Sequence, residues 1–488
     1  MDRRTFLKQG VAAGVATAMQ AETKPPSARR PMNVLYVFSD QHRAASLPGE
    51  VFNQALAPNL DAFRHRNFSM ERCISNYPLC APYRGIFMSG TWPYQSGMIN
   101  NGGQLGNRFP SIGDTFARNG YHTGYVGKWH LSATDDDFTP PGPHRQGFED
   151  WHVWCSTDHH YTAYTFDQHT GKKIAPTGYS ATHMTDEAIT FVNGQKQTEK
   201  PWFLVLSWNP PHPPFDPPKE QRDLYNPGAL KLRPNVQIQG KEHLDTLRKL
   251  EQGYYGAITA IDLEFARLMK ALEDSGQADN TIVVYSSDHG EMMGASGWMG
   301  KRLPHDESCH VPFFVRHPGV TQPGSKSDIL FSSIDIYPTL CGLAGITPPK
   351  HCGGTDFSAA VHGKNVPSPD AVFLMNNTKR GERDGHPPDF RGIRTQTHTY
   401  AVAGDGRWCL YDNGKDPYQI KNLVRDPDYK PLMAQFDKQI TTWLKTASDP
   451  FQFEQASKKY SPFPVLDNKL PRKFHKGGGT DDSDGDDD

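Results

Sequence analysis

Residues 33–42 read NVLYVFSDQH, a continuous apolar run that gives way at once to polar side chains. Continuous rather than alternating apolarity is typical of a strand that is buried on both faces, as in a parallel sheet covered by helices. Similar short runs recur along the chain, with helical patterns between them, at 123–126, 202–207, 281–285 and 312–315. We therefore predict an α/β fold with a large, mostly parallel sheet sandwiched by helices.

Two segments between these runs are predicted to form covering helices. Residues 111–120 open with Ser-Ile-Gly-Asp, which is a capping pattern, and stop at Gly120. Apolar residues recur at helical spacing over 247–272, and this pattern ends before Gly276. Such a pattern indicates a helix with one face in the core.

The C-terminal part of the chain has a different texture. After about Pro367, alternating segments are punctuated by Gly and Pro, and an amphipathic run follows at 430–446. These features predict a smaller α+β subdomain with an antiparallel sheet and a terminal helix. We expect a main domain over 32–365, this subdomain over 366–465, and a disordered tail over 466–488, which ends in DDSDGDDD.

The first ten residues, MDRRTFLKQG, place two arginines before a short apolar run. This pattern resembles a twin-arginine export signal, which we expect to span residues 1–21. The alternative is a short basic helix that is retained in the protein. No other stretch is apolar enough for a transmembrane helix, so we expect a protein exported by the twin-arginine machinery to the periplasm or beyond.

Composition excludes several classes of protein. Hydrophobic residues make up 36% of the 488, which indicates a folded chain, and a net charge of −2 argues against a nucleic-acid partner. The seven cysteines are scattered without a CxxC pair or a Cys/His spacing, which argues against zinc. Cys341 and Cys352 are close enough in sequence to form a disulfide, but two free thiols are an equal alternative.

Four of the predicted strands end in side chains that can carry chemistry. In an open α/β sheet, ligands collect outside the carboxyl ends of the strands, so such residues are candidates for one shared site. The residues concerned are Asp40, Gln41, Lys128, His130, His212, Asp288 and His289.

Three of these residues, Asp40, Gln41 and Asp288, offer hard oxygen ligands of the kind that Ca²⁺ or Mg²⁺ takes. A helix N-cap is the alternative role for Asp40. His289 is less typical of a calcium shell and could instead hydrogen-bond a nucleophile.

Residues 80–90, CAPYRGIFMSG, resemble the sulfatase signature Cys-x-Pro-x-Arg followed by a small hydroxyl residue and Gly. Other motifs resemble that family in the expected order, namely DQ, GKWH, a Pro-rich His segment, SDHGE and MGKRLPHDES. Departures from the pattern are Tyr83, Ser89 and Gln41, the last in place of a frequent second Asp. The resemblance implies the alkaline phosphatase-like fold and an enzymatic conversion of Cys80 to formylglycine.

The resemblance also implies a role for most of the site. One Ca²⁺ would be held by Asp40, Gln41, residue 80, Asp288 and His289. Arg84 would hold the formylglycine loop, and Lys128 and Lys301 would bind sulfate oxygens or the hydrated aldehyde.

Proton transfer would fall to three side chains, of which Asp288 is also a metal ligand. Asp288 would take the attacking proton, His130 would assist elimination, and His212 would protonate or hydrogen-bond the leaving oxygen. Local alternatives are a solvated loop lysine for Lys301 and a structural turn for His212. For Cys80 the alternative is a buried thiol or a disulfide with Cys73.

The function implied is hydrolysis of sulfate esters, with a sulfated carbohydrate as the expected substrate. A formylglycine-generating or anaerobic sulfatase-maturating enzyme is the expected partner. Alternatives are a phosphate or phosphonate monoester hydrolase of the same superfamily, or a non-catalytic carbohydrate-binding relative. Residues 149–164, EDWHVWCSTDHHYTAY, are either a surface that stacks on sugar rings or part of the core.

Overall fold

The computed structural model describes residues 30–47, 54–132, 138–154, 159–377 and 387–461. The expected export signal at 1–21 and the expected tail at 466–488 lie outside the described residues. Within the described part, no helix combines the length and the apolarity needed to cross a membrane.

An eight-stranded sheet forms the centre of the protein, and its strand order is β12-β2-β11-β9-β1-β8-β4-β5. The five strands β9, β1, β8, β4 and β5 are mutually parallel, as predicted. The segment predicted at 312–315 becomes β11, which runs antiparallel to β9. The strands are β1 (Asn33–Asp40), β2 (Phe68–Met70), β4 (His122–Lys128), β5 (Asp150–Trp154), β8 (Trp202–Pro211), β9 (Thr281–Ser287), β11 (Phe313–Arg316) and β12 (Lys326–Ser327).

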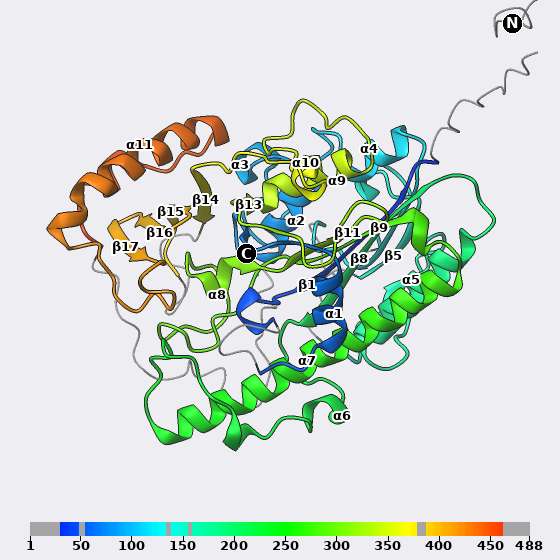
Figure 1. Ribbon diagram of the computed structural model, residues 1–488, viewed down its shortest axis with the longest axis horizontal. Coiled ribbons are helices and arrows are strands. Elements are labelled where there is room, and N and C mark those ends of the chain that lie inside the picture. The colour runs from blue at the N-terminus through cyan, green and yellow to red at the C-terminus, as the bar shows by residue number, and fades with distance from the viewer. Residues whose placement is uncertain (1–29, 48–53, 133–137, 155–158, 378–386, 462–488) are drawn as a thin grey trace, which may run out of the picture.

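Helices cover both faces of this sheet (Figure 1). Val34, Tyr36 and Phe38 of β1 pack into one core, while Leu35 and Val37 pack into the other. Because side chains alternate between the faces of a strand, a continuous apolar run fills both cores at once. One face carries α2 (Cys80–Ser89), α4 (Ile112–Arg118) and α9 (Ser333–Leu343), and the other carries α1 (Pro58–Arg66), α5 (Ser180–Gly194) and α7 (Lys241–Asp274).

Both helices expected from the sequence are present. Ser111 caps α4 by accepting a hydrogen bond from the backbone N–H of Asp114, whose side chain accepts in turn from the N–H of Ser111. The long helix α7 begins six residues before Leu247 and ends at Asp274. It lies along one face of the sheet (Figure 1).

A four-stranded antiparallel sheet and a helix form the C-terminal part, as expected. Its elements are β14 (Ala371–Asn376), β15 (Phe390–Thr395), β16 (His398–Ala403), β17 (Gly406–Asp412) and α11 (Lys430–Ala447). Ile393 and Tyr400 of this sheet share a hydrophobic cluster with Phe436 of α11 and with Ile86 of α2. The C-terminal sheet is thus packed against the helix that begins at Cys80.

The remaining elements are short. They are β3 (Cys73–Ile74), β6 (Thr165–Phe166), β7 (Lys173–Ile174), β10 (His310–Val311), β13 (Phe331–Ser332), α3 (Pro93–Ser96), α6 (Lys219–Arg222), α8 (Asp306–Cys309), α10 (Ser358–Val361) and α12 (Phe453–Ala456). Six cysteines lie in the described residues and all six are free thiols, so Cys73 and Cys80 are not joined, nor are Cys341 and Cys352.

Candidate active site

The carboxyl ends of the central strands bring most of the predicted residues together. Asp40 is the last residue of β1, and Lys128 is the last residue of β4. Asp288 and His289 follow β9 directly. Because β1 pairs in parallel with both β8 and β9, these strands end at one edge of the sheet.

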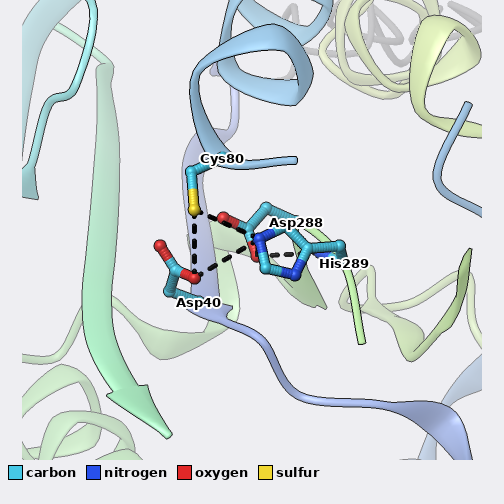
Figure 2. A group of neighbouring side chains, drawn as sticks. All are labelled: Asp40, Cys80, Asp288 and His289. Atoms are coloured by element: carbon cyan, nitrogen blue, oxygen red, sulfur yellow. Dashed lines mark hydrogen bonds and ion pairs between the residues drawn. The ribbon is translucent and has the colours of Figure 1, made fainter. Parts of the chain in front are cut away.

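Cys80 reaches the same place from the first turn of α2. Its Sγ lies 3.2 Å from Nε2 of His289, 3.4 Å from Nζ of Lys301 and 3.6 Å from Oδ1 of Asp40. Figure 2 shows Asp40, Cys80, Asp288 and His289 pointing toward one another. The thiol is therefore at the centre of the cluster, although it is only 1% exposed.

Arg84 lies one helical turn after Cys80, so both side chains leave α2 on the same side. Its Nη2 lies 3.2 Å from Oδ2 of Asp40 and 3.4 Å from Oδ2 of Asp288. Its Nη1 donates to the carbonyl of Lys128 at 2.6 Å and to Oγ of Ser207 at 2.7 Å. One buried guanidinium thus joins the ends of β1 and β4, the middle of β8 and the residue that follows β9.

Charge around Cys80 favours an anion. Burial and the carboxylate of Asp40 raise the pKa of the Cys80 thiol, but Lys301, Lys128 and His289 outweigh them and hold this pKa well below its ordinary value. A thiolate is the form that this environment stabilises. Any negatively charged oxygen that occupied the same position would experience the same field.

Four ligand atoms are close enough to hold one metal ion. Those of Asp40, Cys80, Asp288 and His289 all lie within 4.8 Å of one another. Both carboxylates are fully buried, and burial together with the charge of Asp40 raises the pKa of Asp288 to about 6. Two buried carboxylates this close need compensating positive charge, and their hard oxygen atoms fit a divalent cation such as Ca²⁺.

Gln41 borders this cluster at a backbone φ of 75°, which non-glycine residues rarely adopt. Its backbone N–H donates to Oδ1 of Asp288 at 3.0 Å, and its carbonyl accepts from the hydroxyl of Tyr254 at 2.8 Å. Its side-chain Oε1 accepts from Nζ of Lys301 at 2.9 Å. These contacts direct the amide oxygen toward the cations of the site.

Lys128 and Lys301 bring positive charge from two directions. Nζ of Lys128 lies 2.9 Å from Oδ2 of Asp40 and donates to Oδ1 of Asn209 at 3.2 Å. Gly127, directly before this lysine, has a φ of 107°, and a Cβ there would lie 2.0 Å from the carbonyl oxygen of Ser207. Only glycine allows β4 to approach β8 closely enough to place Lys128.

His212 completes this side of the cluster. Its Nε2 lies 2.9 Å from Nζ of Lys301, and its Nδ1 lies 2.8 Å from the carbonyl of Pro213. Since an ammonium only donates and a carbonyl only accepts, these two contacts place a ring proton on Nδ1 and make Nε2 the acceptor. Lys301 is 9% exposed and contacts both Gln41 and His212, so it is no solvated loop lysine.

His130 is placed differently from the other predicted residues. It is buried at a φ of 55°, and its Nδ1 has no hydrogen-bond partner within the described residues. The structure gives no hydrogen bond from His130 to Cys80 or to Lys128. The polypeptide brings the other nine predicted side chains into one network.

The family model for sulfatases matches residues 32–346. This chain belongs to the sulfatase family. A second family model, for the C-terminal part of N-sulphoglucosamine sulphohydrolase, matches residues 294–446. The protein is accordingly an enzyme that hydrolyses sulfate esters, and its large sheet with a C-terminal antiparallel sheet is the alkaline phosphatase-like fold.

Three relatives illustrate how far the likeness extends. The chain is 32% identical over 430 residues to an ulvan-active sulfatase of Formosa agariphila, which covers 86% of this chain and 82% of that protein. It is 29% identical over 526 aligned positions to an endo-4-O-sulfatase of Bacteroides thetaiotaomicron. That alignment covers 96% of this chain and 99% of the relative. The solved structure of the putative sulfatase yidJ from Bacteroides fragilis superposes with a TM-score of 0.80 at 28% identity. The superposition covers 88% of this chain and 99% of that structure.

Sequence reasoning missed several residues that support this sulfatase site. Asn209 contacts Lys128, and His160 donates from Nε2 to the carbonyl of His212 at 2.8 Å. Glu291 accepts from the side-chain amide of Gln41. Asn209 and Glu291 stand inside motifs that the sequence already singled out, but their contacts depend on how distant segments fold together.

Of the aromatic segment 149–164, the structure describes residues 149–154 and 159–164, and residues 155–158 lie outside the described residues. Trp151 and Trp154 are buried, and the ring of Trp151 packs against Trp129 at a centroid distance of 4.7 Å. Tyr161 is 44% exposed and packs against Tyr179. The two tryptophans therefore belong to the core.

Proposed function

We propose that this sulfatase uses a formylglycine made from Cys80 and one Ca²⁺ ion. Asp40, Asp288, His289 and residue 80 would hold the ion, with Gln41 as a further ligand. The observation that carries the proposal is the position of Cys80 Sγ, which lies within 3.6 Å of a carboxylate, an imidazole and an ammonium. A hydrated formylglycine supplies two geminal hydroxyls, one to attack sulfur and one whose later deprotonation expels the sulfate.

A sulfate ester resists attack because its sulfuryl group is negatively charged. When bound, calcium supplies positive charge that offsets this repulsion. Lys128 and Lys301 bind sulfate oxygens, since their ammonium groups approach the cluster from different strands and loops. Arg84 holds the two carboxylates of Asp40 and Asp288 in place.

Two groups are candidates for moving protons. Asp288 is proposed to accept a proton from the attacking hydroxyl, because its carboxylate lies in the same cluster of ligand atoms as Cys80. Nε2 of His212 faces Lys301, and after taking a proton from that ammonium it would protonate or hydrogen-bond the leaving oxygen. His130 is proposed to assist elimination, and His289 to hydrogen-bond the nucleophile, which its 3.2 Å distance from Cys80 Sγ supports.

The proposed substrate is a sulfated carbohydrate. Support comes from two relatives, one named for activity on ulvan and one named an endo-4-O-sulfatase. Hydrolysis of a phosphate or phosphonate monoester is the alternative, because the same site would hold those anions. A non-catalytic carbohydrate-binding protein would have no need for the charged network around Cys80.

Maturation and export are proposed to follow in order. Cys80 is 1% exposed, so a formylglycine-generating or anaerobic sulfatase-maturating enzyme must reach it before the chain folds. The twin-arginine route exports folded proteins, which leaves time for this step in the cytoplasm. We propose that residues 1–21 direct the matured protein to the periplasm or beyond.

Mass spectrometry of the peptide that contains residue 80 tests the proposal. We expect an aldehyde that reacts with hydrazides, and activity that is lost on chelation and restored by Ca²⁺. Turnover should be measured on a panel of sulfated sugars, an aryl sulfate and an aryl phosphonate. Unmodified Cys80 in fully active protein would overturn the formylglycine, and preference for the phosphonate would favour the alternative function.

A further inference from the structure

We infer that Glu291 is a positioning residue that orients the amide of Gln41 and the loop of Lys301 for the metal and the sulfate. The inference rests on the proposed function, because it concerns the same site. Glu291 is 1% exposed, and it belongs neither to the predicted site residues nor to the metal-ligand group. Its carboxylate nevertheless contacts three groups around the site.

One oxygen of Glu291 organises the loop that carries Lys301. Oε1 accepts from the backbone N–H of Met293 at 2.8 Å and from that of Gly300 at 2.7 Å. Gly300 directly precedes Lys301. One carboxylate oxygen therefore binds both ends of the loop from Met293 to Gly300.

The other oxygen of Glu291 fixes which way the Gln41 amide points. Oε2 of Glu291 accepts from Nε2 of Gln41, while Oε1 of Gln41 accepts from Nζ of Lys301 at 2.9 Å. A carboxylate only accepts hydrogen bonds and an ammonium only donates them. The amide has therefore one satisfactory orientation, with its oxygen toward Lys301 and its nitrogen toward Glu291.

This orientation matters for metal binding. A cation near Asp40 and Asp288 is attracted by an amide oxygen and repelled by an amide NH₂ group. Since Gln41 carries no charge, its contribution depends wholly on the orientation of its amide. Groups that orient a metal ligand from behind typically change metal affinity about 10–100-fold when they are altered.

The substitution Glu291→Gln separates the two tasks of this carboxylate. Oε1 of the new amide can still accept from Met293 and Gly300, but its NH₂ group then faces Gln41. Gln41 must turn its oxygen toward position 291 and its NH₂ group toward Lys301. We expect calcium to bind at least tenfold more weakly in titration calorimetry, and the unfolding temperature to fall even with chelator present.

Exchanging the two side chains restores the pattern of donors and acceptors. In the double variant Gln41→Glu with Glu291→Gln, the amide at 291 donates to a carboxylate at 41, which accepts from Lys301. The single variant Gln41→Glu instead places two buried carboxylates against each other. Both single variants should be less stable than the parent, and the double variant should recover most of the unfolding temperature and calcium affinity.

Glu251→Gln is the matched control. Glu251 is also a carboxylate with 1% exposure, but it lies on α7 and has no hydrogen bond to Gln41 or to the Lys301 loop within the described residues. We expect its calcium affinity to stay within about threefold of the parent. A loss in this control as large as that in Glu291→Gln would show that any buried carboxylate nearby has the same effect, and would overturn the inference.

Two readouts keep the inference separate from the proposed function. If the parent protein binds no calcium, the metal proposal fails, yet the unfolding temperatures in chelator still test the positioning of Gln41. If the fall in unfolding temperature of the double variant equals the sum of the falls in the two single variants, the inference is overturned, whether or not calcium binds. If Glu291→Gln does not fold, the unfolding temperatures of Gln41→Glu and of the double variant are compared instead. A double variant that is no more stable than Gln41→Glu would overturn the inference.

Discussion

Lys301 and His212 contact each other directly, with Nζ of the lysine 2.9 Å from Nε2 of the histidine. The ammonium donates this hydrogen bond, so the histidine nitrogen that faces the site carries a lone pair. His212 in turn donates from Nδ1 to the carbonyl of Pro213. The pair presents a cation and a proton-transfer group side by side.

His212→Ala should therefore damage hydrolysis according to the leaving group. A sugar alcohol needs a proton as the bond to sulfur breaks, whereas an activated phenol leaves readily as an anion. We expect kcat/KM to fall about 10²–10⁴-fold for a sulfated sugar and less than about tenfold for 4-nitrophenyl sulfate. Equal losses on both substrates would remove His212 from the leaving-group role.

Asp288→Ala should abolish turnover and leave the fold cooperative, because the role of this carboxylate is local to the metal and the nucleophile. The expected loss in kcat is more than about 10³-fold, with weaker calcium binding. Asp335 is a suitable control, since burial also raises the pKa of this carboxyl to about 6. Its carboxylate accepts hydrogen bonds from Ser332 and Thr355 at the start of α9. Asp335→Ala should lower the unfolding temperature and keep kcat. Full activity in Asp288→Ala would contradict the assignment.

Arg84→Ala should reduce the stability of the protein as well as its activity. The guanidinium is 1% exposed and contacts Asp40, Asp288 and Ser207. Removing one partner of a buried ion pair leaves the other charge uncompensated, at a cost of about 3–5 kcal/mol. Chemical denaturation of the calcium-free proteins measures this difference. A change below about 1 kcal/mol would show that Lys128 and His289 already compensate the two carboxylates.

Acid should destabilise the protein partly through His160. Burial lowers the pKa of His160 to about 3, and its Nε2 donates to the carbonyl of His212. Below pH 6.5 the unfolded chain binds a proton at this residue that the folded chain does not, so stability present above pH 6.5 is lost as the pH falls toward 3. One such group contributes a slope of about 1.4 kcal/mol per pH unit within that window.

The measurement compares the parent with His160→Gln by urea denaturation between pH 4.5 and 6. The variant should be less stable at neutral pH, because the contact with His212 is altered, but its stability should fall less steeply with acid. Parallel pH profiles would mean that His160 takes up a proton in the folded protein.

The sequence by itself determined the architecture, and it predicted nine of the side chains that the structure brings together at the ends of the strands. Continuous apolarity over 33–38 placed β1 inside a covered sheet, because a strand with apolar side chains on both faces must be buried on both. The Cys-x-Pro-x-Arg string predicted where the site would form. The direction of β11 was beyond the reach of the sequence, since this strand has the same side-chain period in either direction.

Tertiary structure alone decided which predicted residues contact one another. His130 and Lys128 stand two residues apart in one motif, yet Lys128 joins the network and His130 does not. Gln41 and Glu291 are 250 residues apart and their side chains meet. A hydrogen bond depends on the distance and direction between two atoms, and only the packing of β1 against β9 sets these for side chains so far apart in the chain.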